Sequence, residues 1–395
     1  MNPIKVQLDK LAKSINQRSE KSGINLSQGG LFHYAVENDQ EKSRIHLRLD
    51  PDGSGLLLVN ASRVMHLNPS AATMARLALE RTPHAEAIRM LTQRFRVSRQ
   101  QAELDYANFA DQLRELIRPD GACPIHELDL DIQVPFSARP SAPYRMDLAI
   151  TYRCNNDCAH CYNARSRNFP EIDTQAWKSI IDRLWEIGIP HLVFTGGEPT
   201  LREDLPELIA YAQNKGQVTG LNTNGRRLSD RNYLDRLVEA GLDHVQITLE
   251  SHDPTIHDLM VCAKGAWKQT SAGIQHALES PLYVMTNTTM LQENSPFLAE
   301  TLEHLASLGV PTVGLNALIY SGRGQKVGTG LPESSLQPLL TTAREYTDRH
   351  QQRLIWYTPT EYCNFDPMQL ELGVKGCTAA LYNMCVEPDG RVLPC

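Results

Sequence analysis

Residues 151–162 read Thr-Tyr-Arg-Cys-Asn-Asn-Asp-Cys-Ala-His-Cys-Tyr, which places Cys154, Cys158 and Cys161 at the spacing Cys-x3-Cys-x2-Cys. Iron–sulfur clusters are held by cysteine thiolates, and a cubane cluster usually takes four of them. Three thiolates therefore predict a cluster with one iron left open to a ligand that is not protein. By analogy with zinc sites, an open coordination position is typical of a reactive centre.

The main alternative for these cysteines is a structural zinc ion, which would need a fourth Cys or His ligand. His160 and Cys123 are the two conceivable candidates. Such a site leaves the later run Thr195-Gly-Gly-Glu-Pro199 unexplained. Taken alone, that second run could be a plain turn from a strand to a helix. The two motifs together favour the iron–sulfur interpretation.

Length and composition describe an ordinary globular chain of two or three domains, with 395 residues, 41% hydrophobic residues and 22% charged residues. The formal net charge of −7 gives no reason to expect nucleic acid or an anionic membrane as a partner. No apolar run approaches the ~20 residues that a membrane span needs, and residues 1–10 show no export signal. The nine cysteines are an odd number in a long chain, which favours reduced thiols in the cytoplasm.

The N-terminal part is predicted to contain a polar, poorly ordered segment at residues 1–40 and a compact α+β domain at residues 41–118. Alternating apolar residues predict strands at 45–49 and 55–59, and a third strand is expected at 64–67. Three helices should follow. Asn68 and Pro69 form the start of the first, and Ser98 with Gln101 forms a capping box for the third.

Apolar positions in the third helix should form one stripe, made of Ala102, Tyr106, Phe109, Leu113 and Leu116. Residues 119–145 are rich in proline and are predicted to be a linker.

Beyond the linker, strands and helices alternate, which predicts a parallel sheet covered by helices. The strands are expected at 147–152, 191–195, 217–222, 244–249, 282–288 and 312–318. The helices are expected at 173–187, 203–214, 230–240, 266–279, 296–308 and 334–350. Such sheets carry their chemistry at the carboxyl ends of the strands, where the cysteine triplet and the Gly-Gly-Glu-Pro run both fall.

Together, the cysteine triplet and Gly196-Gly197-Glu198-Pro199 resemble the radical S-adenosylmethionine (SAM) enzymes. The resemblance covers roughly residues 145–325. It implies an α/β fold with a partial (β/α)6 barrel of the TIM type over residues 146–325. It also implies a [4Fe–4S] cluster on the three cysteines, whose open iron chelates the methionine group of SAM. The family cleaves SAM reductively to a 5′-deoxyadenosyl radical, which abstracts a hydrogen from the substrate.

The same resemblance implies a set of SAM-binding residues: His160, Gly196, Gly197, Glu198, Pro199, Asn224, Thr248, Glu250 and Arg323. Many relatives that modify peptides carry His-Asp-x-x-Arg-Gly after the fourth strand. Here the run begins at His257 and Asp258, and Val261 stands where those relatives have arginine. Arg323 is the candidate to replace that arginine. No residue is identified as a catalytic acid or base.

The C-terminal residues 326–395 resemble the opening of a cysteine-rich SPASM or twitch extension, which holds auxiliary iron–sulfur clusters. The implied auxiliary ligands are Cys363, Cys377, Cys385 and Cys395. The sequence stops at Cys395, which suggests a shortened chain. Alternatively, these are inert thiols that pack as small hydrophobes. Cys123 and Cys262 stand alone and are expected to bind no metal.

The N-terminal domain resembles the PqqD-like element that binds the leader of a ribosomal precursor peptide, by adding a strand to a sheet edge. A winged-helix-like domain that serves only as an assembly surface is the alternative.

The order of parts predicts a cytoplasmic radical SAM maturase that crosslinks or otherwise modifies a precursor peptide. It would take electrons from a flavodoxin or ferredoxin and would bind neither nucleic acid nor membrane. Two other functions remain open: a radical SAM enzyme for a non-peptide substrate such as a tetrapyrrole, and a non-catalytic protein that binds peptide or metal.

Overall fold

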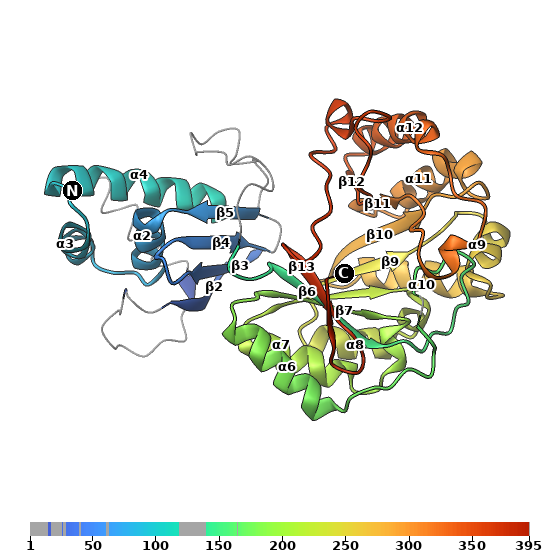
Figure 1. Ribbon diagram of the computed structural model, residues 1–395, viewed down its shortest axis with the longest axis horizontal. Helices are drawn as coiled ribbons and strands as arrows, with labels where there is room; N and C mark the ends of the chain where they lie inside the picture. The colour runs from blue at the N-terminus through green and yellow to red at the C-terminus, as the bar shows by residue number, and fades with distance from the viewer. Residues whose placement is uncertain are drawn as a thin grey trace. The chain divides into compact units, whose positions relative to one another are not determined.

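The computed structural model describes residues 15–16, 26, 29–38, 41–60, 63–117, 140–163 and 165–394. The chain divides into two compact units (Figure 1). The first holds residues 1–142 together with 183–190 and 216–218, and the second holds the remainder.

The first unit contains a five-stranded antiparallel sheet in the order β1-β2-β3-β4-β5. The strands are β1 (Ile15–Asn16), β2 (Gly30–Asn38), β3 (Glu41–Leu49), β4 (Gly55–Val59) and β5 (Arg63–Leu67). The expectation of poor order was wrong for residues 30–38. They pair with all of β3, from Gly30 opposite Leu49 to Asn38 opposite Glu41.

Three helices follow this sheet: α2 (Pro69–Leu79), α3 (His84–Arg94) and α4 (Arg99–Ile117). The expected helix starts are confirmed, since the Asn68 side chain accepts a hydrogen bond from the Ala71 amide, and Ser98 accepts one from the Gln101 amide. The predicted α4 stripe is buried throughout. It packs with residues such as Leu47 and Leu57 of the sheet, so one apolar core joins the helices to the strands.

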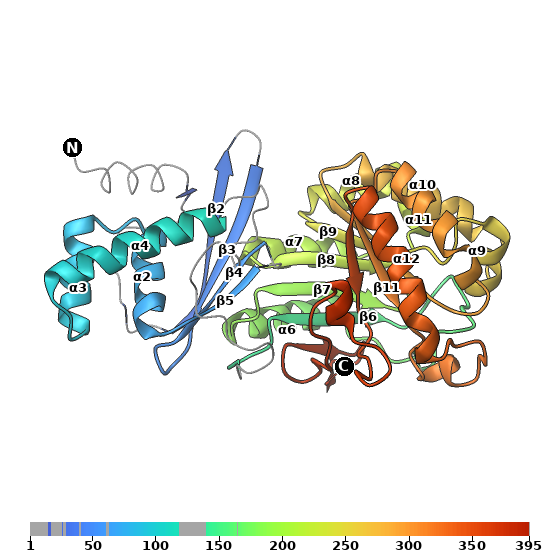
Figure 2. The same ribbon diagram turned by 90° about the horizontal axis from the view of Figure 1, so that it is seen from above.

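The second unit contains a nine-stranded sheet in the order β12-β11-β10-β9-β8-β7-β6-β13-β14. Its neighbouring strands β7, β8 and β9 can be followed in Figure 2. The strands are β6 (Arg145–Thr151), β7 (His191–Gly196), β8 (Val218–Thr223), β9 (His244–Thr248), β10 (Tyr283–Thr289), β11 (Thr312–Asn316), β12 (Arg353–Trp356), β13 (Asn383–Val386) and β14 (Val392–Leu393). Strands β8 to β12 are parallel, as are β7, β6 and β13. The sheet stays open, which is compatible with a partial barrel.

The six expected strands correspond to β6–β11, and the sheet extends beyond them at both edges. Strand β12 adds to β11, and β13 adds to β6 in parallel, with β14 antiparallel to β13. Strand β6 begins at Arg145, inside the segment expected to be a linker.

The helices of this unit are α6 (Thr174–Glu186), α7 (Leu205–Lys215), α8 (Arg231–Glu239), α9 (Pro254–Val261), α10 (Ala266–Leu278), α11 (Leu298–Ser307) and α12 (Leu336–Arg349). All except α9 were expected from the sequence. Short 3-10 helices are η1 (Pro199–Leu201), η2 (Arg226–Ser229), η3 (Ser295–Phe297), η4 (Gly322–Gln325), η5 (Glu333–Ser335) and η6 (Pro367–Leu370). None of the helices within the described ranges is both long enough and apolar enough to cross a bilayer.

Strand β9 shows how the sheet separates its two faces. Val245 and Ile247 are fully buried, while His244, Gln246 and Thr248 are only partly buried and point to the opposite side. Side chains alternate along a strand, so each strand presents one apolar row and one polar row. The upper members of the polar row, Gln246 and Thr248, line the cavity described next.

Candidate functional site

A cavity of about 750 Å³ lies at the carboxyl ends of β6–β11, and this volume is within the range of ~300–1,000 Å³ that ligand sites occupy. Its wall comes from the loop after β6, the ends of β7–β11, and η4 with the residues before it. Parallel sheets place their ligands at this end of the strands.

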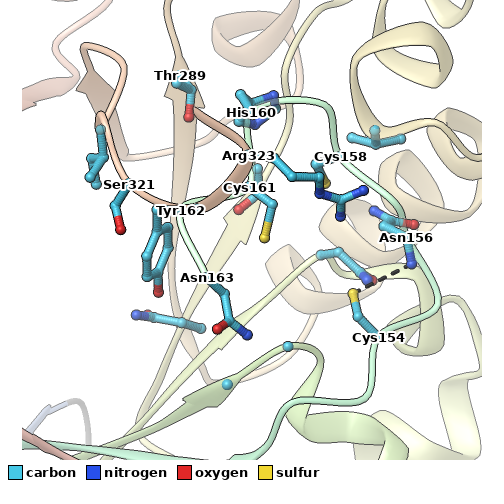
Figure 3. Close-up of a pocket in the computed structure, with 18 of the residues that line it drawn as sticks. Cys154, Asn156, Cys158, His160, Cys161, Tyr162, Asn163, Thr289, Ser321 and Arg323 are labelled. Atoms are coloured by element: carbon cyan, nitrogen blue, oxygen red, sulfur yellow. Dashed lines mark hydrogen bonds between the residues drawn. The ribbon is translucent and has the colours of Figure 1, made fainter. Parts of the chain in front are cut away.

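The three cysteines lie in the loop after β6 and line the cavity (Figure 3). Their loop is fixed by backbone hydrogen bonds to elements far along the chain. The Asp157 amide donates to the Val261 carbonyl at 2.9 Å, and the Ala159 amide donates to the Met260 carbonyl at 3.0 Å, both in α9. Helix α9, which sequence reasoning missed, therefore supports the cysteine loop.

Three arginines add further support to this loop. Arg226 donates through Nη1 to the Asn155 carbonyl at 2.5 Å and to Asn156 Oδ1 at 2.8 Å. Arg167 and Arg323 both pair with the Asp157 carboxylate at 2.6 Å. The loop is thus shaped by protein contacts on several sides.

The thiols sit in a poorly hydrated environment. Burial raises the pKa of Cys154, against the hydrogen bond that the Asn156 amide donates to its Sγ at 3.4 Å. Burial, followed by the nearby Glu250 carboxylate, raises the pKa of Cys158. A bound metal reverses this situation, because a coordinating thiol loses its proton outright.

This donor set fits a cluster better than a single ion. In the part of the chain that the structure describes, no three His, Cys, Asp or Glu side chains converge on one point, as a zinc ion would require. The three thiols instead surround a shared space, which suits a cluster whose separate irons each take one thiolate (Figure 3).

Gly196 and Gly197 line the cavity, and the reason for glycine is close backbone packing. A Cβ on Gly196 would lie 2.0 Å from the Thr151 carbonyl oxygen, and one on Gly197 would lie 2.4 Å from that of Arg153. The Gly197 amide also donates to the Thr151 carbonyl at 2.7 Å. These glycines hold the end of β7 against the start of the cysteine loop.

Glu198 is fully buried, and it is absent from the cavity wall within the described residues. Its Oε1 accepts from the Thr200 amide at 3.1 Å, the Thr200 hydroxyl at 2.7 Å and the Thr223 hydroxyl at 2.7 Å. Its Oε2 accepts from the Asn224 amide at 2.8 Å. Burial raises the pKa of this carboxyl, and the hydrogen bonds oppose that effect.

The geometry therefore makes Glu198 a link between the ends of β7 and β8. Pro199 starts η1 and is likewise buried away from the wall.

His160 and Glu250 form an ion pair across the cavity wall, with Nε2 and Oε1 2.9 Å apart. Burial lowers the pKa of His160, but the charge and hydrogen bond of Glu250 outweigh it, and the net pKa is raised. The second oxygen of Glu250 accepts from the Thr289 amide at 2.8 Å. These two residues, expected to contact SAM separately, act on each other.

The remaining expected SAM residues, Asn224, Thr248 and Arg323, all line the cavity. Asn224 Nδ2 donates to Asn155 Oδ1 at 2.7 Å, so it also joins the cysteine loop. His257 is buried in α9, and its Nδ1 accepts from the Glu250 amide at 3.1 Å.

Sequence reasoning did not assign a role to several polar residues of the wall. Four of them are carboxamides on neighbouring strands: Asn222, Gln246, Asn287 and Asn316. The available signal was that each lies at or near the carboxyl end of a predicted strand, where parallel sheets carry their ligands. A fifth is Arg165, whose guanidinium forms a two-pronged ion pair with the buried Glu387, at 2.7 and 3.1 Å.

The C-terminal cysteines are arranged differently from the triplet. Cys363 and Cys377 are exposed, and Cys385 lies on β13 opposite Asp147 of β6. Neither these three thiols nor those of the triplet meet at a single point within the described residues. Cys262 is exposed. Cys123 and Cys395, including the auxiliary ligand expected at 395, lie outside the described residues.

Comparison with known families shows which domain contains this site. The model described as "Radical SAM superfamily" matches residues 148–305, which contain the cysteine loop and β6–β10. Residues 148–305 therefore form a radical SAM domain. A second model, "Coenzyme PQQ synthesis protein D (PqqD)", matches residues 46–116 of the first unit.

Curated relatives match only part of the chain. Fe-coproporphyrin III synthase of Methanosarcina barkeri is 36% identical over 180 residues, which is 45% of this chain and 45% of that protein. AdoMet-dependent heme synthase of Oleidesulfovibrio alaskensis is 32% identical over 181 residues, or 45% and 46% of the two chains. The matched region thus spans under half the length of these relatives.

Solved structures share the fold over longer stretches. SuiB of Streptococcus suis, solved with its precursor peptide SuiA, has a TM-score of 0.64 and 14% identity, covering 89% of this chain and 82% of SuiB. The protein anSMEcpe, solved with bound AdoMet, has a TM-score of 0.51 and 16% identity, covering 64% and 74%. At these identities the likeness establishes the fold, a parallel-sheet radical SAM core.

Proposed function

We propose that this radical SAM protein is a peptide maturase that modifies a ribosomally made precursor peptide. The observation that carries the proposal is the presence in one chain of a radical SAM domain with an intact cysteine triplet and a PqqD-like domain. SuiB, which shares the fold along most of this chain, was solved with a precursor peptide. The cytoplasm suits such a protein, because its thiols must stay reduced.

Cys154, Cys158 and Cys161 would hold the [4Fe–4S] cluster. When bound, the cluster and SAM supply reductive cleavage of the sulfonium and a 5′-deoxyadenosyl radical that takes a hydrogen from the substrate. The protein supplies orientation and excludes water. Asn224 and Thr248 offer polar groups on the wall beside the thiols.

Other residues act by positioning these groups. Glu198 fixes the Asn224 amide, and Glu250 fixes His160 beside the third cysteine. Arg323 reaches the Asp157 carboxylate from η4 and so holds the cysteine loop closed on that side. An SAM-binding role for the nine residues named from the sequence remains part of the proposal.

The first unit would bind the leader of the precursor peptide. Its outer strand β5 pairs with β4 on one side only within the described sheet, so a peptide strand could add to the other side. The winged-helix-like domain would then deliver the core segment of the peptide to the cavity. An external flavodoxin or ferredoxin would supply the electron.

The second candidate function is modification of a tetrapyrrole. It is favoured by the curated relatives, an Fe-coproporphyrin III synthase and a heme synthase, at 36% and 32% identity over 180 and 181 residues. The PqqD-like domain argues for the peptide instead.

Anaerobic reconstitution with iron, sulfide and dithionite tests the radical chemistry. The full chain should release 5′-deoxyadenosine from SAM, and the Cys154→Ala/Cys158→Ala/Cys161→Ala variant should fall to background, at least about 100-fold lower. Release that survives in the triple variant would refute the cluster assignment. Release of 5′-deoxyadenosine by the wild type, and not by the triple variant, would exclude the non-catalytic alternative. Addition of coproporphyrin III or of a candidate precursor peptide then separates the two substrates by mass spectrometry of the product.

An auxiliary cluster on Cys363, Cys377, Cys385 and Cys395 is a further part of the proposal. Its support is the cysteine spacing of the sequence alone. Iron analysis of the triple variant provides the test. Iron retained by that variant and lost on the further changes Cys377→Ala and Cys385→Ala would support an auxiliary cluster. A triple variant without iron would exclude it.

A further inference from the structure

A row of carboxamide side chains crosses the inner face of the sheet, with one member on each of four neighbouring strands. The members of this carboxamide row are Asn222 on β8, Gln246 on β9, Asn287 on β10 and Asn316 on β11. Asn222 pairs in register with Gln246, Asn287 lies opposite Thr248, and Asn316 lies opposite Thr289. From β9 to β11 the row therefore advances by two residues per strand and runs diagonally.

Several donors and acceptors of this row have no protein partner. Asn316 Nδ2 donates to Asn287 Oδ1 at 2.8 Å, and the Tyr357 hydroxyl donates to Gln246 Oε1 at 3.1 Å. Among the described residues, no hydrogen bond is made to the side-chain carboxamide of Asn222, to Gln246 Nε2 or to Asn287 Nδ2. Asn287 is only 8% exposed, so a partner for its NH2 group must come from inside the cavity.

By contrast, most of the positively charged side chains of the cavity wall already form ion pairs with carboxylates of the protein. Arg165 pairs with Glu387, while Arg167 and Arg323 share Asp157. Lys326 is the one lysine or arginine of the described wall for which the structure has no ion pair. The wall thus offers neutral hydrogen-bonding groups in quantity and little positive charge for a ligand with several carboxylates.

We propose that the carboxamide row binds the main chain of an extended peptide segment, an inference that rests on the proposed maturase function. A carboxamide carries two N–H donors and an accepting carbonyl, which complement the C=O and N–H groups of a peptide bond. Main-chain hydrogen bonds give affinity that does not depend on the peptide's side chains. A tetrapyrrole with several carboxylates would instead need arginine or lysine partners.

The dimensions set the length of the bound segment. Neighbouring strands lie ~4.8 Å apart, so the row spans about 14 Å across the sheet before its diagonal rise is added. An extended chain covers ~3.3–3.6 Å per residue, so roughly five residues fit. Gly314 pairs in register with Asn287, and the missing side chain there makes room for the Tyr357 ring, since a Cβ on Gly314 would lie 2.6 Å from Tyr357 Cε2.

The test uses the full chain, reconstituted with iron and sulfide, saturated with SAM and kept free of oxygen. The probe is a library of random hexapeptides with an acetylated N-terminus and an amidated C-terminus. Peptides that the protein retains from the library are labelled, and their Kd for the protein is measured by fluorescence anisotropy. Each is compared with a copy that is N-methylated at its two central peptide bonds, and with coproporphyrin III as a competitor.

The protein variants are Asn287→Leu and Gln246→Leu, and the matched control is Asn232→Leu on the exposed surface of α8. Each cavity variant should raise the peptide Kd about fivefold, as expected for one hydrogen bond worth ~1 kcal/mol. N-methylation should raise it at least about tenfold, and the control should have no effect. Iron content and SAM binding of all three variants should match the wild type, which shows that they fold.

The inference would be overturned if the protein retained no peptide, or if the Kd of the retained peptides were unchanged in both cavity variants. It would also be overturned if coproporphyrin III displaced a labelled peptide at a lower concentration than the unlabelled peptide does. Release of 5′-deoxyadenosine is measured in the same samples without peptide. Its absence from the wild type would refute the radical chemistry separately, because the binding measurement does not depend on turnover.

Discussion

At each end of the parallel sheet a histidine lies in a close side-chain pair, and the pKa of that histidine shifts in opposite directions at the two ends. At the amino ends, His191 and His244 meet across β8 with their Nε2 atoms 2.8 Å apart. Burial, with help from the charge of Arg145, lowers the pKa of His244 to about 4, so that ring is neutral at pH 7. At the carboxyl ends, His160 meets Glu250, and its pKa is raised despite burial. The pKa of His160 is raised, unlike that of His244, because its partner is a carboxylate.

The comparison shows how the sheet separates stability from chemistry. The carboxyl end holds charged groups around a cavity, and each is fixed by partners from distant parts of the chain. The amino end holds the pair of His191 and His244, in which the His244 ring is neutral, outside the described cavity wall. Changes at the first end should therefore affect both folding and the cluster, and changes at the second should affect folding alone.

The largest effect is expected from Glu198→Ala at the carboxyl end. The substitution leaves buried donors of Thr200, Thr223 and Asn224 without an acceptor, and it should lower the free energy of unfolding by about 3 kcal/mol. Urea unfolding of the full chain measures it. Glu203→Ala is the control, because that side chain is 76% exposed and its loss should cost less than about 1 kcal/mol. Equal losses would mean that Glu198 is no structural link.

Gly197→Ala should have the next largest effect. Its new Cβ would meet backbone oxygens of Arg153 and Tyr152 at 2.4 and 2.6 Å, and backbone cannot rotate away. We expect about 2–3 kcal/mol of destabilisation and a displaced cysteine loop. Gly265→Ala is the control, since it has open space around it but a φ of +78°, which costs about 1 kcal/mol. Normal iron content in Gly197→Ala would show that the loop tolerates the shift.

Arg226→Gln should remove hydrogen bonds that hold the cysteine loop, without creating a cavity in the hydrophobic core. Two hydrogen bonds to Asn155 and Asn156 are lost, each worth ~1 kcal/mol. The reconstituted variant should lose iron to a chelator several-fold faster than the wild type. The exposed Arg231→Gln, which breaks only a surface pair with Glu279, should lose iron at the normal rate. Identical rates for both variants would remove Arg226 from the support.

His244→Gln tests the amino end through pH. The folded pKa of about 4 lies below the ordinary value of 6.5, so the unfolded chain binds the proton more readily. This contribution to stability is complete above pH 6.5 and is lost as pH falls, by about 1.4 kcal/mol per unit down to pH 4.

The wild type should therefore lose stability more steeply than His244→Gln between pH 6.5 and 5. Urea unfolding at several pH values gives both slopes, and the exposed His350→Gln should keep the wild-type slope. Parallel slopes for His244→Gln and the wild type would contradict a neutral buried ring. Release of 5′-deoxyadenosine at pH 7.5 should be unchanged, in contrast to the changes at the carboxyl end.

Much of the fold could be predicted from local pattern, because six long strands alternate with amphipathic helices. The strands that were missed depend on partners. Strands β12 and β13 have four residues each and form only against β11 and β6. Strand β2 was overlooked although Leu31-Phe-His-Tyr-Ala-Val36 is rich in residues that favour strands.

The candidate site was predictable in its position but less so in its detailed roles. The cysteine triplet and Gly-Gly-Glu-Pro mark the correct end of the sheet. The same motif reads identically whether Glu198 faces a ligand or the interior. What decides is the position of Thr223 and Asn224, about 25 residues further on, and that depends on the packing of β8 beside β7. The role of Arg165 likewise depends on Glu387, which no local pattern connects to it.

The pairing of Arg165 with Glu387 has a consequence for how the protein is made. The two residues are 222 positions apart in the chain. At a translation rate of ~5–20 residues per second, the arginine leaves the ribosome roughly 10–40 s before its carboxylate partner. During that interval the thiol-bearing loop is already synthesised while the strand that flanks β6 is still missing. Arg165, which lines the cavity, therefore gains its carboxylate partner only after the cysteine loop has been synthesised.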